Sequence, residues 1–214
     1  MHSIQDANNP EAVLTVEHLN IQHQQQVLVD DLNFKLHAGE TIAIVGESGS
    51  GKSISSLAVL GLLPSTLKIK GQVWLGQQDV LTLKSEQLRQ IRGQKMAMIF
   101  QEPMTALNPL HRVEKIIGET LLLQGWSKAK TQARIIELLN DVGMTDPEDK
   151  LRRYPHELSG GQRQRVMIAM ALALDPDILI ADEPTTALDV TLQAQILALL
   201  KSLQQSRKMA MILI

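Results

Sequence analysis

The chain has 214 residues, of which 44% are apolar and 21% charged, enough for one large domain or one domain with an inserted subdomain. A net charge of −2 and an aromatic content of 2% argue against a nucleic-acid partner, because neither a basic surface nor a stacking platform is available. The absence of cysteine excludes disulfides and thiolate metal sites, and no apolar run reaches the roughly 18–20 residues that cross a bilayer.

Taken in chain order, the apolar pattern alternates between strands and helices. Short runs rich in β-branched residues predict strands at 13–21, 27–36, 41–45, 71–75, 96–100, 178–181 and 209–214. Apolar residues at helical spacing predict helices at 53–63, 85–93, 128–142, 162–174 and 192–203. Ser85 and Ser127 are expected N-caps, and the helix after Ser127 is expected to bury Ala133, Ile136, Leu139 and Val142.

This order predicts an α/β fold with a parallel core, an N-terminal antiparallel β-subdomain and an inserted helical subdomain at about 102–160. We expect one domain over 12–214, preceded by a flexible N-terminus at 1–11. The chain stops within an apolar run at Ile214, which indicates C-terminal truncation inside a core strand.

The first glycine-rich segment follows the strand at 41–45 and opens a helix. It matches G-x-x-x-x-G-K-[ST] fully, with Gly46, Glu47, Ser48, Gly49, Ser50, Gly51, Lys52 and Ser53. Its glycines let backbone N–H groups converge on phosphate oxygens, and the helix adds its positive end. Lys52 is expected to neutralise β- and γ-phosphate charge, and Ser53 to place a hydroxyl on Mg²⁺.

An acidic pair ends the apolar strand at 178–181. The carboxyl ends of parallel strands form the ligand-binding edge, so Asp182 is expected to hold Mg²⁺ there. Glu183 is expected to act on the attacking water as a general base.

A second glycine segment, Leu158, Ser159, Gly160, Gly161 and Gln162, also opens a helix. Ser159 is a good N-cap, so an ordinary capped helix start is one interpretation. One nucleotide rarely needs two such helix starts, and the other interpretation is that this segment binds a nucleotide held by a second chain.

Together these segments resemble the ATP-binding-cassette (ABC) ATPase family. The resemblance is carried by 46–53, Gln101, 158–162, 178–183 and 187–189, and it extends from about Leu14 to the end. It implies that ATP and Mg²⁺ are bound, that Glu183 is catalytic, and that Gln101 touches Mg²⁺ and the attacking water. It also implies that Ser159, Gly160, Gly161 and Gln162 contact ATP of a second ABC domain in a head-to-tail dimer, with Asp189 at the seam.

The segments 100–110, 154–158 and 181–189 are most similar to the ATPases of dipeptide and oligopeptide importers, and to the N-terminal cassette of a fused pair. This implies transmembrane permease subunits as partners, an extracytoplasmic peptide-binding protein acting through them, and a place on the cytoplasmic face of the inner membrane. Residues 104–110 are the candidate docking segment for the permease; a plain connecting loop is the alternative.

Two features depart from the family pattern. His23 stands where the family usually has an aromatic residue that stacks on adenine, and a surface turn histidine is the alternative. The switch histidine that follows the last strand is missing, so we expect this chain to bind ATP but hydrolyse it poorly. The other function considered is a soluble ABC ATPase of DNA repair or ribosomes; the short spacing between Gln101 and Ser159 and the absence of cysteine favour transport.

Overall fold

A computed structural model describes residues 12–186 and 188–214, so the expected flexible segment 1–11 and Ala187 lie outside the described residues. The strands are β1 Ala12–His23, β2 Gln26–His37, β3 Thr41–Ala43, β4 Lys68–Leu75, β5 Gln78–Asp79, β6 Met96–Ile99, β7 Ile178–Ala181 and β8 Ala210–Leu213. The helices are α1 Lys52–Val59, α2 Ser85–Ile91, α3 Pro103–Ala106, α4 Val113–Leu123, α5 Lys128–Asp141, α6 Pro147–Leu151, α7 Gly160–Ala171 and α8 Val190–Arg207, with 3-10 turns at Val80–Thr82 and Pro155–Glu157.

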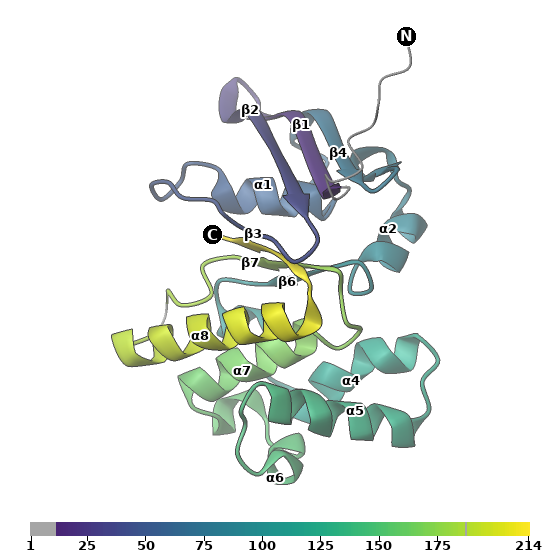
Figure 1. Ribbon diagram of the computed structural model, residues 1–214, viewed down its shortest axis with the longest axis vertical. Helices are drawn as coiled ribbons and strands as arrows, with labels where there is room; N and C mark the ends of the chain where they lie inside the picture. The colour runs from purple at the N-terminus through teal and green to yellow at the C-terminus, as the bar shows by residue number, and fades with distance from the viewer. Residues whose placement is uncertain (1–11, 187) are drawn as a thin grey trace.

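The strands form two sheets. One is antiparallel in the order β2-β1-β4-β5, and the other is parallel in the order β3-β8-β7-β6. In Figure 1, α1 lies between the two sheets, whereas α7, α8 and then α4 and α5 lie beyond the parallel sheet. The expected combination of a parallel core and an N-terminal antiparallel sheet is confirmed.

Side chains on β7 show how the core is divided. Successive residues of a strand point to opposite faces of its sheet. Ile178 and Ile180 accordingly pack with α1 and the antiparallel sheet, whereas Leu179 and Ala181 pack with α7 and α8. All four are fully buried, so both faces of the parallel sheet are covered.

The strand before the phosphate loop is less buried than the sequence indicated. β3 covers only Thr41–Ala43, and Thr41 and Ala43 are exposed, as is Val45, at 89%. Within the described residues β3 pairs with β8 alone and is an edge strand, which is why its β-branched run is not enclosed.

Two helix predictions need correction. Ser85 is the first residue of α2 and not its N-cap; Lys84 occupies the cap, and its N–H donates to the side chain of Gln87. In α5, Ser127 is the N-cap as expected, but Ala133 is exposed and Ile136 only partly buried. The face is rotated so that Thr131, Ile135 and Leu138 join Leu139 and Val142 in the core.

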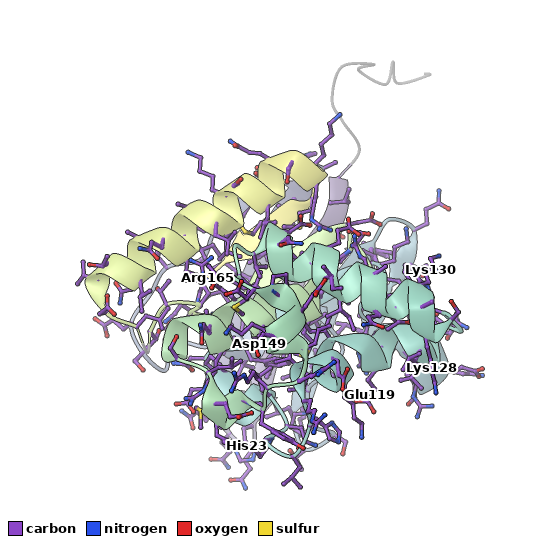
Figure 2. All side chains as sticks on the ribbon, turned by 90° about the horizontal axis from the view of Figure 1, so that it is seen from below. His23, Glu119, Lys128, Lys130, Asp149 and Arg165 are labelled. Atoms are coloured by element: carbon purple, nitrogen blue, oxygen red, sulfur yellow. The ribbon has the colours of Figure 1, made fainter. Side chains whose placement is uncertain are left out.

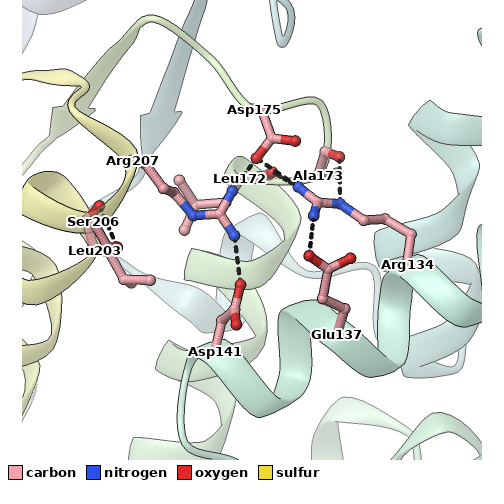
Figure 3. A network of polar contacts seen from close by, with 9 residues as sticks. All are labelled: Arg134, Glu137, Asp141, Leu172, Ala173, Asp175, Leu203, Ser206 and Arg207. Atoms are coloured by element: carbon pink, nitrogen blue, oxygen red, sulfur yellow. Dashed lines mark hydrogen bonds and ion pairs between the residues drawn. The ribbon is translucent and has the colours of Figure 1, made fainter.

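A network of charged side chains joins α5 to the elements that enter the parallel sheet (Figure 3). Arg134 of α5, whose side chain is only 10% exposed, contacts Glu137 at 2.8 Å and Asp175 at 2.6 Å. It also donates to two carbonyls just after α7. Arg207, at the end of α8, pairs with Asp141 at 2.5 Å and with Asp175. Asp175 is therefore shared by α5 and α8.

Across the described residues, the structure contains no helix that is both long and apolar enough to cross a membrane.

Candidate functional site

The glycine-rich loop joins β3 to α1, and two of its glycines adopt a left-handed backbone. Gly49 has φ 82° and Gly51 has φ 89°. A Cβ at Gly49 would meet open space, but one at Gly51 would fall on the carbonyl oxygen of Leu28. Gly51 is also the N-cap of α1, so the loop meets the helix through a backbone that only glycine adopts without a clash.

Lys52 folds back across this loop. Its Nζ donates to the carbonyl oxygens of Gly46 at 2.8 Å and Glu47 at 2.7 Å. Both partners are uncharged, so these bonds fix the position of the ammonium without neutralising it. A fixed positive charge at the start of a helix is well suited to hold phosphate oxygens.

The loop and the acidic strand end meet directly. Ser53 Oγ donates to Asp182 Oδ1 at 3.0 Å, although the two residues are 129 positions apart. Ser53 lies in the first turn of α1 and Asp182 follows β7, so the parallel sheet brings the hydroxyl and the carboxylate to its carboxyl edge.

The surroundings of Asp182 disfavour the charged form of its carboxyl group. Its burial raises the pKa of the carboxyl above the ordinary value of 3.8, and the nearby charge of Glu183 raises it further. The hydrogen bond from Ser53 and the charge of Lys52 act in the opposite direction. Asp182 is 5% exposed and a second acid, Glu183, follows it in the chain, so a bound cation would stabilise this position.

Glu183 is held by two donors. Gln101 Nε2 donates to its Oε2 at 2.8 Å, and Thr186 Oγ1 donates to the same oxygen at 2.9 Å. The backbone of Glu183 has φ 43°, and its N–H donates to the carbonyl of Ile214 at 3.1 Å. The fold thus brings the end of β6, the end of β7 and the turn after β7 to one carboxylate.

The second glycine segment forms a capped helix start. Ser159 Oγ accepts from the N–H of Gln162 at 3.3 Å, and Gln162 Oε1 accepts from the N–H of Ser159 at 3.0 Å. This reciprocal pair is a capping box. Gly160 is exposed, whereas Gly161 is buried against Leu192, where an added Cβ would lie 3.2 Å from a methyl group.

That contact places two helix starts side by side. Asp189 is the N-cap of α8, and its Oδ1 accepts from the N–H of Leu192 at 3.0 Å. Gly161 of α7 abuts the same leucine. The structure therefore groups Ser159, Gly161 and Asp189 in one region. No hydrogen bond among the described residues joins this region to the phosphate loop.

His23 lies at the tip of the hairpin between β1 and β2, where it pairs with Gln26. It is exposed, and Figure 2 shows it at the margin of the molecule in that view. Its expected contact with adenine stays a prediction.

The ABC transporter family profile matches residues 29–186, which include the loop at 46–53, Gln101, the capped segment and the acidic pair. The chain belongs to the ABC transporter family. It is 52% identical over 213 residues to the peptidoglycan transport ATP-binding protein YejF of Agrobacterium fabrum, covering 96% of this chain and 39% of that protein. It is 47% identical over 211 residues to the dipeptide transport ATP-binding protein DppD of Bacillus subtilis, covering 95% of this chain and 63% of that protein.

Solved structures of this family share the fold. The dimeric, post-hydrolysis state of the ATP-binding cassette MJ0796 bound to ADP and Pi superposes with a TM-score of 0.80 at 27% identity, covering 94% of this chain and 86% of that one. CbiO1 from Clostridium perfringens, part of the ABC transporter complex cbiONQ, superposes with a TM-score of 0.79 at 27% identity, covering 94% and 77%. The chain spans between 39% and 64% of the length of four curated relatives named YejF and DppD.

Sequence reasoning missed one contributor to this site, the hydroxyl of Thr186. The available signal was its spacing, because a residue three positions after Glu183 in a Pro-containing turn returns to the start of that turn.

Proposed function

We propose that this chain is the ATP-binding and ATP-hydrolysing part of a transporter that imports peptides or peptide-like solutes. The observation that carries the proposal is the bond between Ser53 of the phosphate loop and Asp182, with Glu183 beside it. It unites a phosphate cradle, a site for a cation and a general base at one edge of the sheet. The names of the relatives, which refer to dipeptide, oligopeptide and peptidoglycan transport, support the substrate class.

In the proposed reaction, the backbone N–H groups of the loop and Lys52 hold the phosphates of ATP. Gln101 orients a water molecule, and Glu183 accepts its proton as the water oxygen bonds to the γ-phosphorus. The bond to the bridging oxygen breaks, and ADP and phosphate leave. Glu183 is suited to this role because both hydrogen bonds to its carboxylate fall on Oε2, which leaves Oε1 to face the water.

The residues present also fit Mg²⁺. Ser53, Asp182 and Gln101 would hold it, since Mg²⁺ needs only one or two protein carboxylates when phosphate oxygens and water complete its coordination. Burial raises the pKa of Asp182, and the hydrogen bond from Ser53 and the charge of Lys52 offset this only in part, which supports a cation at this carboxylate. When bound, Mg²⁺ would neutralise part of the phosphate charge of ATP.

The capped segment is proposed to serve a second cassette. Ser159, Gly160, Gly161 and Gln162 present an exposed helix start, and Asp189 lies in the same region. A head-to-tail dimer, homo- or heteromeric, would place this region against the ATP of the partner cassette. The dimeric state of the solved cassette MJ0796 supports this arrangement.

Permease subunits are the proposed membrane partners, and an extracytoplasmic peptide-binding protein acts through them. The candidate docking segment, residues 104–110, presents Met104 at 59% and Leu110 at 82% exposure. Arg163 of α7 lies 2.9 Å from the sulfur of Met104, so this segment touches the helix that the capped segment begins. We accordingly place the protein on the cytoplasmic face of the inner membrane.

ATP binding and hydrolysis test the proposal. In the full-length protein, wild type should bind Mg-ATP and release phosphate; Lys52→Ala should weaken binding at least tenfold, and Glu183→Gln should retain binding while losing most turnover. Co-purification with permease subunits tests the transport role. Failure to bind ATP, or exclusive co-purification with ribosomes or DNA, would overturn the proposal.

A further inference from the structure

The carboxylate of Glu183 is fixed on one oxygen only. Oε2 accepts from Gln101 at 2.8 Å and from Thr186 at 2.9 Å, while no partner for Oε1 is present among the described residues. A carboxylate held in this way cannot rotate without losing a hydrogen bond, so the direction of its free oxygen is fixed. The two donors therefore select which oxygen receives a proton.

The two donors reach Glu183 in different ways. Gln101 lies in the exposed loop after β6, so its side chain depends on the position of a segment that includes the proposed docking residues. Thr186 belongs to the same short turn as Glu183, and its own N–H donates to the carbonyl of Glu183 at 3.2 Å. Thr186 therefore donates twice to Glu183, from its backbone N–H to the carbonyl oxygen and from its hydroxyl to the carboxylate.

We propose that Thr186 is a positioning residue for Glu183, an inference that rests on the proposed ATPase function. The turn is stiff because Pro184 fixes one backbone angle and the β-branched side chain of Thr186 has few rotamers. Its hydroxyl holds Oε2 even when Gln101 moves, so Oε1 stays aimed at the attacking water. A general base that drifts by about 1 Å loses a large factor in rate.

The test compares Thr186→Val, Thr186→Ser and Thr185→Val in the full-length protein. Valine keeps the shape and removes the hydroxyl, so kcat should fall about tenfold or more, the equivalent of one hydrogen bond to a charged carboxylate. KM for ATP and the Kd for ATP should change less than about twofold, because Thr186 is not part of the phosphate cradle. Serine should restore kcat to within about twofold, and Thr185→Val, the same change one residue away, should leave it unaltered.

Repeating the Thr186→Val change in the Glu183→Gln variant distinguishes a positioning role from a merely structural one. In Glu183→Gln the base is absent, so adding Thr186→Val should cause no further loss of the residual rate. A loss of equal size in both backgrounds, or a parallel loss of ATP affinity, would show a merely structural role and overturn the inference.

The outcomes also separate this inference from the proposed function. Wild-type turnover together with an unaltered Thr186→Val overturns the positioning role alone. ATP binding without any hydrolysis by wild type, measured in a single turnover with enzyme in excess, overturns the hydrolytic function and the positioning role together.

Discussion

The two edges of the parallel sheet differ in how their charges are arranged. At the amino edge, the two acids that precede β7 have cationic partners: Asp175 pairs with Arg134 and Arg207, and Asp177 pairs with Lys95 at 2.9 Å. The contacts of Asp175 join α5 and α8 to the loop that enters β7 (Figure 3). The pair of Lys95 and Asp177 separately joins the starts of β6 and β7.

At the carboxyl edge, the charged side chains of the site bond only to neutral groups. Lys52 bonds only to carbonyls, while Asp182 and Glu183 accept only from neutral donors. None of the three forms an ion pair within the described part of the chain. An edge that compensates its own charges holds the fold together, whereas an edge that does not is prepared for a ligand that brings both phosphate and cation.

The largest effect should come from the carboxyl edge. Gly51→Ala drives a Cβ into the carbonyl of Leu28 at a left-handed φ, and should lower the free energy of unfolding by about 3 kcal/mol or more. Gly49→Ala is the matched control, because it has a similar φ but open space and should cost only about 1 kcal/mol. Urea unfolding of both variants measures the difference, and equal costs would refute the steric argument.

The amino edge should lose less from a single change. Arg134→Met keeps most of the apolar stem but removes the donors to Asp175, Glu137 and two carbonyls, and should cost about 2 kcal/mol. ATP affinity should stay within about twofold, because the network lies at the edge opposite the phosphate loop. Arg152→Met, on an exposed arginine outside the network, should cost less than about 0.5 kcal/mol by the same measurement.

A change in the capped segment should cost less stability than either of these. Ser159→Ala removes the hydroxyl that accepts from Gln162, and should cost about 1 kcal/mol in thermal or urea unfolding. Ser127→Ala removes the corresponding cap of α5 and serves as a control of similar stability cost. Only Ser159→Ala should weaken ATP-dependent dimer formation; equal dimerisation of the two variants would contradict the proposed partner site.

The sequence could predict the parts of this molecule that depend on local chemistry. The phosphate loop, the buried strand β7 and the caps at Ser127 and Ser159 follow from residue types at fixed spacing. The exposure of apolar side chains was harder to predict. Val45 and Ala133 are apolar but exposed, because no other part of the fold packs over them. The hydrogen bonds from Gln101 and Thr186 to Glu183 could not be predicted either, since they depend on where two loops meet.

In the smallest expected effect, the change in stability on replacing an aspartate by asparagine should differ in sign between the two edges. Asp182→Asn removes a buried charge whose pKa is raised by burial but keeps an acceptor for Ser53, so the metal-free protein should become slightly more stable. A raised pKa means that the charged form is penalised in the folded state. The stabilising contribution of protonation is therefore present at low pH and lost as pH rises through the raised pKa.

The gain in Asp182→Asn should accordingly be greatest near neutral pH and shrink as pH falls through that raised pKa toward 3.8. Asp177→Asn, in an ion pair with Lys95 at the amino edge, should show no gain at any pH. Thermal unfolding in a chelating buffer from pH 4 to 8 measures both. A gain of the same size at both positions would mean that the two edges do not differ in charge compensation, and that an open carboxylate is no sign of a ligand site here.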